Sequence, residues 1–363
     1  MTGRTMRLSR PRTGTRLRFG RLGQLGQRPG LLAAIGIAVL LVVMMVAVAA
    51  GSVSIHIATT LGIILRALGF PITETWAAST TTIVLDLRVP RVLTAAVVGG
   101  GLAVAGATFQ GLLRNPLADP YVLGSASGAA LGAAIAVLIP VQLAVLQLGL
   151  LNLLAFAGAL GATAAVVAIG HRRGMGSMTT LLLTGYAISS LLAAGLAMAM
   201  YASGSELRQI FDFLLGGLGG ASWARLAIAA PLVIGATIAI QWRAGVLDGL
   251  LLGDKAAAHL GVNVGRERTI LLGLAALATA AAVAISGLIG FVGLVAAHAV
   301  RLVVGPEARR VIPLSALFGA ILLVVADLIA RLLGEIPVGV VTALIGAPIF
   351  VWLLVRSRSA YEV

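Results

Sequence analysis

The sequence contains no cysteine and little charge, and both shortages exclude classes of protein. Without cysteine the chain can form neither disulfides nor thiolate metal sites. Charged residues are 10% of the 363, whereas a soluble globular domain carries about 25%, so this composition cannot build an ordinary water-exposed surface. Aromatic residues are 5% and do not interleave with the arginines, so the net charge of +14 does not indicate a nucleic-acid partner.

Residues for catalysis are also scarce. The only lysine, Lys255, is followed by Ala256, so the chain lacks the lysine and hydroxyl residue that end a P-loop. The four histidines lie far apart and fit no metal-ligand spacing. No nucleophile, base and orienting group occur together. We therefore predict a protein that is not an enzyme and that holds no metal or cofactor of its own.

Apolar residues are abundant instead. They make up 60% of the chain, and the mean hydropathy is +1.07. A bilayer core about 30 Å thick needs roughly 20 apolar residues per helix, and such runs recur along the sequence. Because the runs do not alternate with polar residues, they favour helices over a β-barrel. The predicted fold class is an all-α polytopic membrane protein with about ten transmembrane helices, at residues 31–50, 91–113, 121–139, 146–170, 178–201, 224–242, 268–285, 288–304, 312–332 and 338–355.

The basic residues predict the orientation. With the amino terminus inside, 20 of the 26 lie in inner segments, as the positive-inside rule requires. Residues 1–30 form a basic cytoplasmic tail, 31–356 the transmembrane domain and 357–363 a second cytoplasmic tail. The run Leu31–Ala50 is long enough to span, and no convincing cleavage site follows, so we expect a retained first helix in the cell inner (cytoplasmic) membrane.

The long inner connection, one aspartate and four prolines predict how the helices are grouped and where several of them begin. The inner connection 243–267 divides the spans into two five-helix halves, which the odd number of spans places in opposite orientations. Asp119 is a predicted N-cap. Proline costs no hydrogen bond at a helix start, so spans are predicted to begin at Pro90, Pro120, Pro313 and Pro337.

Three glycines, Gly124, Gly128 and Gly132, repeat every four residues. This spacing produces one smooth helical face against which another backbone can pack closely. We favour tight helix packing as its purpose, with the lining of a translocation path as the alternative.

Six stretches from residue 87 onward are motifs that allow a comparison with known families. The run at 87–133 reads LRVPRVLTAAVVGGGLAVAGATFQGLLRNPLADPYVLGSASGAALGA. Further matches start at residues 181, 214, 250, 286 and 336: LLLTGYAISSLL, LLGGLGGASW, LLLGDKAAAHLGVNVGRER, SGLIGFVGLVAAHAVRLVVGP and IPVGVVTALIGAPIFVWLL. In this order the motifs, which cover most of residues 87–356, resemble the FecCD family of ABC importer permeases. One departure is Ala297, where the family usually has proline before the histidine.

The resemblance implies a type II ABC importer permease fold and a set of partners. These are a second permease subunit, in a homo- or heterodimer, two cytoplasmic ATPase subunits that bind ATP and Mg²⁺, and an extracytoplasmic substrate-binding protein. The implied substrate is a ferric siderophore or related large metal chelate, with haem or cobalamin as alternatives. A secondary carrier is disfavoured, because Asp327 is the only carboxylate well inside a predicted span and an i,i+4 pair with Arg331 explains it.

Three arginines are candidates for docking the binding protein. Arg88 and Arg91 lie on the predicted outer side, against the loop bias, and a cation in a first helical turn opposes the macrodipole. The resemblance implies that these residues, with Arg331, meet acidic residues of the binding protein. For Arg331 the pair with Asp327 is the stronger interpretation.

The inner segment 248–265 is the candidate coupling element for the ATPase. It is apolar for a cytoplasmic connection, so we expect a partner to cover it. Gly253 can break the chain, Asp254 can cap a short helix and Gly261 can end it. The alternative is a re-entrant loop packed on its own subunit. The predicted coupling residues are Leu252, Gly253, Asp254, Lys255, His259, Leu260 and Gly261.

The fifth predicted span carries two further candidate sites. Met178 and Thr179 align with the family's inner gate residues, although they could simply begin a helix. Ser189 and Ser190 are candidates for the translocation pathway, with a packing or carbonyl-capping role as the favoured alternative.

Overall fold

The computed structural model describes residues 28–51, 53–139, 144–145, 148–172 and 178–361, and most of them are helical. Two two-residue strands, β1 (Ala144–Val145) and β2 (Leu148–Gly149), pair antiparallel before the helix that follows them. The helices are α2 (Pro29–Ala49), α3 (Ile57–Ala67), α4 (Ala78–Thr82), the π-helix η1 (Ile83–Arg88), α5 (Val89–Leu112), α6 (Ser125–Leu138), α7 (Leu150–Arg172), α8 (Met178–Ala202), the 3₁₀-helix η2 (Gly204–Glu206), α9 (Leu207–Leu215), α10 (Trp223–Trp242), α11 (Ala244–Leu251), α12 (Asp254–His259), α13 (Val264–Ser286), α14 (Val292–Val304), α15 (Ala308–Leu332) and α16 (Val338–Tyr361).

Every predicted span overlaps one of these helices, but the helices differ in length. Among the described residues seven are long and apolar enough to cross a membrane, and α6, α14 and the described part of α16 are shorter apolar helices. The amino-terminal tail at residues 1–27 lies outside the described part of the chain.

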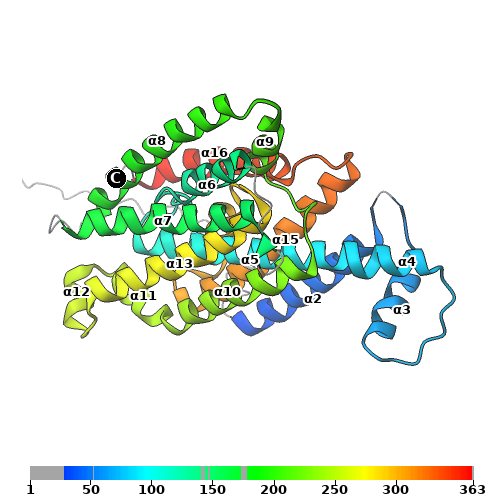
Figure 1. The fold of residues 1–363 in the computed structure, drawn as a ribbon. Coiled ribbons are helices and arrows are strands. Elements are labelled where there is room, and N and C mark those ends of the chain that lie inside the picture. Colours follow the sequence, from blue (N-terminus) through cyan, green and yellow to red (C-terminus); the bar gives the residue numbers. More distant parts are fainter. Residues whose placement is uncertain (1–27, 52, 140–143, 146–147, 173–177, 362–363) are drawn as a thin grey trace, which may run out of the picture.

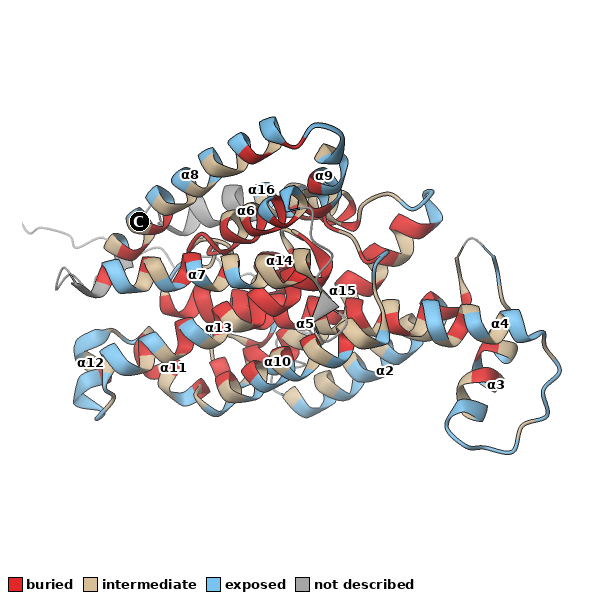
Figure 2. Ribbon diagram, in the orientation of Figure 1, coloured by how far each residue is buried: buried red, intermediate tan, exposed pale blue. Residues whose placement is uncertain are grey.

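The helix α5 forms the centre of the bundle. Every residue from Gly99 to Leu112 is buried, and α5 packs against α10, α13, α14 and α15. A Cβ atom at Gly99 would overlap the carbonyl oxygen of Gly319 in α15, and one at Gly106 would overlap that of Gly293 in α14. The absence of side chains therefore brings these backbones together. Figure 2 shows the buried residues concentrated in α5, α13, α14 and α15, with α8 and α12 largely exposed.

The glycine repeat in α6 serves the packing for which it was predicted. A Cβ at Gly128 would overlap the carbonyl oxygen of Gly158 in α7, and one at Gly132 would overlap that of Leu154 in the same helix. The repeat thus seats α6 directly on the backbone of α7. Gly124 has a separate role, because its φ of +82° makes it the left-handed N-cap of α6.

Two predicted helix starts are wrong because tertiary contacts interrupt them. The helix α6 begins at Ser125 rather than near Pro120, and α14 begins at Val292 rather than at 288. The non-helical segments before them meet: the Tyr121 hydroxyl donates to the carbonyl of Ile289 (3.0 Å) and accepts from its amide (3.3 Å). Asp119 is not an N-cap, since its carboxylate accepts the amide of Tyr121 within this irregular segment.

Of the other three prolines predicted to start a helix, two lie at a helix start and one does not. Pro90 lies in the first turn of α5 and Pro337 directly precedes α16, as predicted. Pro313 is wrong as a helix start, because α15 begins at Ala308 and the proline lies inside it. A helical proline leaves the carbonyl four residues earlier without its amide partner. Here the Gln241 side chain of α10 donates to that carbonyl, at Arg309 (3.2 Å).

The bundle has two distinct ends. Figure 1 shows α11 and α12 at one end, which we call the α12 end, and α3 and α4 at the opposite end, which we call the α3 end. The connection from α10 to α13 contains α11 and α12, whereas the connection from α2 to α5 contains α3, α4 and η1. Both candidate sites lie in these connections and the helix ends beside them.

Candidate functional sites at the two ends of the bundle

Arg88, at the α3 end, is buried and fastens the end of α2. It is the last residue of η1 and is 7% exposed. Its guanidinium donates to the carbonyls of Val48 (2.9 Å) and Ala49 (2.8 Å), and also to that of Val53. The last carbonyls of a helix have no partner within the helix. Arg88 therefore supplies hydrogen bonds that the end of α2 lacks.

Arg331, near the end of α15, fastens the same helix from another side. Its guanidinium donates to the carbonyls of Ala47 (2.8 Å) and Ala50 (3.1 Å). Its Nε atom lies 3.0 Å from Oδ2 of Asp327, which confirms the predicted i,i+4 ion pair. Asp327 is 0% exposed, so the pair is shielded from water.

Arg91, in the first turn of α5, is bound only by carboxylates in this network. Its Nε donates to Asp327 (2.9 Å) and its Nη1 donates to Glu335 (2.9 Å). Glu335 follows α15, and its backbone adopts a φ of +60°, which is uncommon for a residue other than glycine. Sequence reasoning missed Glu335, since its partner lies 244 residues away.

A cavity of about 280 Å³ adjoins these side chains. Its lining includes Arg88, Arg91, Arg331 and Glu335, together with Leu218 and Gly219. The structure therefore brings the three predicted docking arginines to one place, and each has a partner within the subunit. Their docking role stays a prediction.

At the α12 end, the short helix α12 lies between two glycines with positive φ. Gly253 has a φ of +112° and Gly261 a φ of +83°, so both ends of α12 turn as predicted. The leucines beside these glycines extend outward: Leu252 is 71% and Leu260 is 67% exposed. Lys255 and His259 are exposed between them. We call residues 252–261 the α12 tip.

Asp254 does not cap α12, which corrects the prediction. No side chain caps this helix, and the Asp254 carboxylate instead pairs with Arg268 of α13 (2.9 Å) and Arg114 after α5 (2.5 Å). Arg114, with a φ of +48°, also donates to the carbonyl of Leu250 (3.0 Å). Asp254 thus connects the α12 tip to α13 and to the end of α5. The hydrogen bonds from Arg268 are the main cause that lowers the pKa of Asp254.

A second aspartate in this connection behaves in the opposite way. The Asp248 carboxylate accepts the amide of Ala308 (2.7 Å) at the first residue of α15. Burial raises the pKa of Asp248, and the hydrogen bond from Ala308 only partly offsets this effect. Asp248 therefore ties α11 to α15, at the opposite side of the connection from Asp254.

The predicted gate and pathway residues lie on α8, whose apolar surface is largely exposed. Thr179 is exposed, and the side chain of Met178 lies outside the described residues. The Ser190 hydroxyl donates to the carbonyl of Tyr186 (2.9 Å), which is the carbonyl-capping alternative, and Ser189 faces Gly124 of α6. The exposed apolar side chains of α8 are Leu183, Tyr186, Leu191, Met198 and Tyr201.

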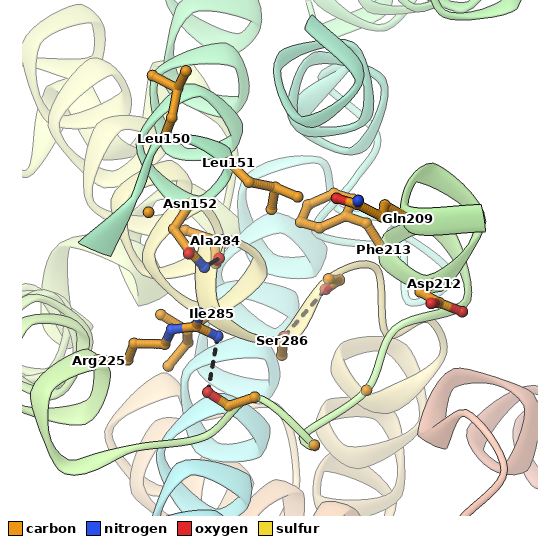
Figure 3. Close-up of a pocket in the computed structure, with 15 residues that line it drawn as sticks. Leu150, Leu151, Asn152, Gln209, Asp212, Phe213, Arg225, Ala284, Ile285 and Ser286 are labelled. Atoms are coloured by element: carbon orange, nitrogen blue, oxygen red, sulfur yellow. Dashed lines mark hydrogen bonds between the residues drawn. The ribbon is translucent and has the colours of Figure 1, made fainter. Parts of the chain in front are cut away.

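Sequence reasoning also missed a cavity of about 800 Å³ between the start of α7, α9 and the end of α13. Asn152, Ile285 and Arg225 line one side of it, and Asp212 lies on the other side, near Phe213 (Figure 3). The Arg225 guanidinium donates to the carbonyl of Gly220 (2.8 Å), and the Asn152 amide donates to that of Ala284. The described residues include no group of three His, Cys, Asp or Glu side chains that could hold a metal ion.

A model of the FecCD transport family matches residues 39–356. The chain belongs to the FecCD family. Ala297, where the resemblance predicted a departure from the family pattern, is fully buried in α14, which runs from Val292 to Val304. A helix without an internal proline keeps its hydrogen bond at this position.

Curated relatives and a solved structure agree with this FecCD assignment. The chain is 43% identical over 277 residues to the cobalamin import system permease protein BtuC of Halobacterium salinarum, covering 76% of this chain and 74% of that one. It is 41% identical over 301 residues to the hemin transport system permease protein HmuU of Yersinia pestis, covering 80% and 90%. A transporter assigned to the metal-chelate type of ABC transporter, solved in an inward-facing conformation, matches with a TM-score of 0.76 and 28% identity, covering 90% and 99%.

This FecCD protein is therefore an all-α, multi-pass membrane protein with the type II ABC importer permease fold. It is a permease subunit with a non-catalytic role.

Proposed function

We propose that this permease carries a ferric siderophore or a related large metal chelate into the cytoplasm, driven by a separate ATPase. The observation that carries the proposal is the α12 tip, where two exposed leucines flank a helix too short to be stable alone. A partner that covers these leucines would order the tip, and the nucleotide-binding subunit is the partner that an ABC transporter provides. The α12 end then faces the cytoplasm, with both termini, in the cell inner membrane.

The variant Leu260→Asp tests the coupling role. A carboxylate in the apolar contact should release the ATPase, or uncouple ATP hydrolysis from transport, without preventing membrane insertion. Co-purification of the ATPase and uptake in proteoliposomes measure the effect. Leu68→Asp is a matched control, because Leu68, at the end of α3, is similarly exposed and is not one of the docking residues. Normal ATPase binding and normal transport by Leu260→Asp would refute the assignment.

The substrate class rests on relatives with different cargoes. Haem and cobalamin are the alternatives, since the names of two relatives refer to hemin and to cobalamin, whereas the solved structure is of the metal-chelate type. A titration of the cognate binding protein with ferric siderophores, hemin and cobalamin distinguishes them. If the binding protein preferred hemin or cobalamin, that compound would become the proposed substrate in place of a siderophore.

Transport by a carrier working alone is less favoured, because Asp327 is paired with Arg91 and Arg331 rather than free to bind a coupling ion.

Ten membrane crossings in two five-helix halves require α6, α14 and α16 to cross together with the seven longer helices. A second permease subunit would cover the exposed apolar face of α8.

On this arrangement the pathway lies along α8, with Met178 and Thr179 as the inner gate and Ser189 and Ser190 on the lining. Crosslinking of Thr179→Cys across the dimer should stop transport, and cysteines at 189 and 190 should react with a water-soluble reagent. The absence of a crosslink in every nucleotide state, or full protection of both cysteines, would remove these residues from the path.

The α3 end then faces the extracytoplasmic side, where the binding protein docks through Arg88, Arg91 and Arg331. Docking through rim charges affects mainly the association rate, so it should weaken as salt increases. The association rate of the binding protein with Arg91→Glu permease, measured at low salt, tests the site without removing the hydrogen bonds that Arg88 donates to the end of α2. An unchanged rate would refute it.

A further inference from the structure

The three arginines at the α3 end are not equivalent. Arg88 and Arg331 together donate to five carbonyls at and just after the end of α2. Turning either guanidinium toward an external partner would leave buried carbonyls without hydrogen bonds, which is unfavourable. Arg91 instead contacts two carboxylates, of which Asp327 is 0% exposed and Glu335 is 54% exposed. A contact with an exposed carboxylate can be exchanged with little loss.

Glu335 has the features of a replaceable partner. It lies in the short turn between α15 and α16, after Gly334, and its φ of +60° is strained for a side chain other than glycine. Its carboxylate reaches Nη1 of Arg91 at 2.9 Å, beside the cavity of about 280 Å³. The cavity provides space next to Arg91 for a second carboxylate.

The local charge fixes the chemistry of the incoming group. The network contains three guanidinium groups and two carboxylates, Asp327 and Glu335, so exchanging one carboxylate for another preserves its balance. Arg91 is partly buried, with its side chain 15% exposed, so another carboxylate must replace Glu335 if Arg91 is to keep both of its ion pairs. An external aspartate or glutamate side chain meets this requirement, because it would bind Arg91 as Glu335 leaves.

We propose that Glu335 is an internal substitute for a carboxylate of the docking protein, and that Arg91 is the only one of the three arginines that exchanges partners. This inference rests on the proposed docking at the α3 end. Arg88 and Arg331 then shape the site by holding α2, and Glu335 competes with the incoming partner. The docking affinity therefore depends on how much more tightly Arg91 binds the carboxylate of the partner than it binds the carboxylate of Glu335.

The variant Glu335→Gln tests the competition, because it removes the charge and keeps the shape. The Kd of the cognate binding protein, identified by co-purification and measured by surface plasmon resonance on permease in nanodiscs, should fall about two- to fivefold, as expected for the loss of one exposed ion-pair competitor. Glu74→Gln is the matched control, since Glu74 pairs with Arg66 at the same end and is similarly exposed. A merely structural Glu335 would give an unchanged or higher Kd, which would overturn the proposal.

Arg91→Gln separates this proposal from the docking proposal on which it rests. If Arg91 exchanges partners, Arg91→Gln should increase Kd, and adding Glu335→Gln to it should have no further effect. An unchanged Kd in Arg91→Gln would refute docking at this site. An increased Kd with no tightening in the single variant Glu335→Gln would refute only the competition. Saturable binding of sodium citrate to the Glu335→Gln permease without binding protein would show that a small free carboxylate occupies the site. That result would overturn the proposal that the occupant is a carboxylate of a protein.

Discussion

The two ends of the bundle are each organised around an aspartate bound by two arginines from different parts of the chain. At the α3 end Asp327 is 0% exposed, and its network holds the end of α2. At the α12 end the Asp254 side chain is 51% exposed, and its arginines position an exposed apolar tip. The same ion-pair chemistry therefore contributes to the fold at one end and presents a surface at the other, and burial makes the difference.

The largest effect is expected from Asp327→Asn. Losing the charge leaves the buried cation of Arg331 without a carboxylate partner, whereas Arg91 keeps Glu335, and this costs about 3–5 kcal/mol in the free energy of unfolding. Thermal unfolding in detergent measures the loss. Glu307→Gln breaks the exposed pair with Arg310 and should cost at most about 1 kcal/mol. Equal losses in both variants would contradict the contrast between buried and exposed pairs.

The next effect concerns the backbone of the α12 tip. Gly253→Ala places a Cβ atom where φ is +112°, which should strain the tip by about 1–3 kcal/mol and reduce co-purification of the ATPase. Gly265→Ala, at the start of α13 and without positive φ, is the control. If both variants retained the ATPase equally, the tip would not need its present conformation.

A smaller effect is expected from Asp254→Asn. This change weakens the pairs with Arg114 and Arg268, each with an exposed carboxylate, so the attachment of the tip should lose about 0.5–1 kcal/mol. Hydrogen exchange should become faster in residues 250–261 and stay unchanged in α5. Lys255→Gln, on the exposed neighbour, should change neither region. Unchanged hydrogen exchange in Asp254→Asn would show that the Asp254 carboxylate does not order the α12 tip.

The smallest effect is a pH dependence with opposite signs for two aspartates in the α10–α13 connection. The lowered pKa of Asp254 means that its contribution to stability is complete above the ordinary aspartate pKa of about 4 and disappears as pH falls through the folded value. The stability difference between wild type and Asp254→Asn should therefore be constant from about pH 7 to 5 and shrink below about 4. For Asp248, whose pKa is raised, protonation on acidification should favour the folded state. Parallel pH profiles for Asp254→Asn and Asp248→Asn would contradict these opposite shifts.

Local sequence signals predicted the parts of this fold that depend on local physics. Apolar runs located α2, α5, α8, α10 and α13 to within a few residues, because a membrane helix satisfies its own backbone. The glycines around α12 gave its ends, and the spacing of Asp327 and Arg331 gave their ion pair.

The errors arose wherever a distant residue changed a local rule. Pro313 stays inside α15 since Gln241 satisfies the carbonyl of Arg309. The start of α6 is delayed by a segment that binds Ile289. Asp254 prefers Arg114, 140 residues away, to the amides of its own helix. The sequence pattern could not predict the burial of Arg88 either, because its carbonyl partners precede it by 35 to 40 residues.

The contacts of Arg331 also set an order of events during biosynthesis. The carbonyl of Ala50 and the guanidinium of Arg331 are separated by 281 residues. At roughly 5–20 residues per second, a ribosome needs about 15–55 s to produce that length of chain. The end of α2 is therefore fastened in two stages, by Arg88 soon after α2 is made and by Arg331 only after α15 is available. A nascent chain that stops before residue 331 leaves the end of α2 without this second anchor, so the full set of hydrogen bonds there depends on a residue near the carboxyl end of the chain.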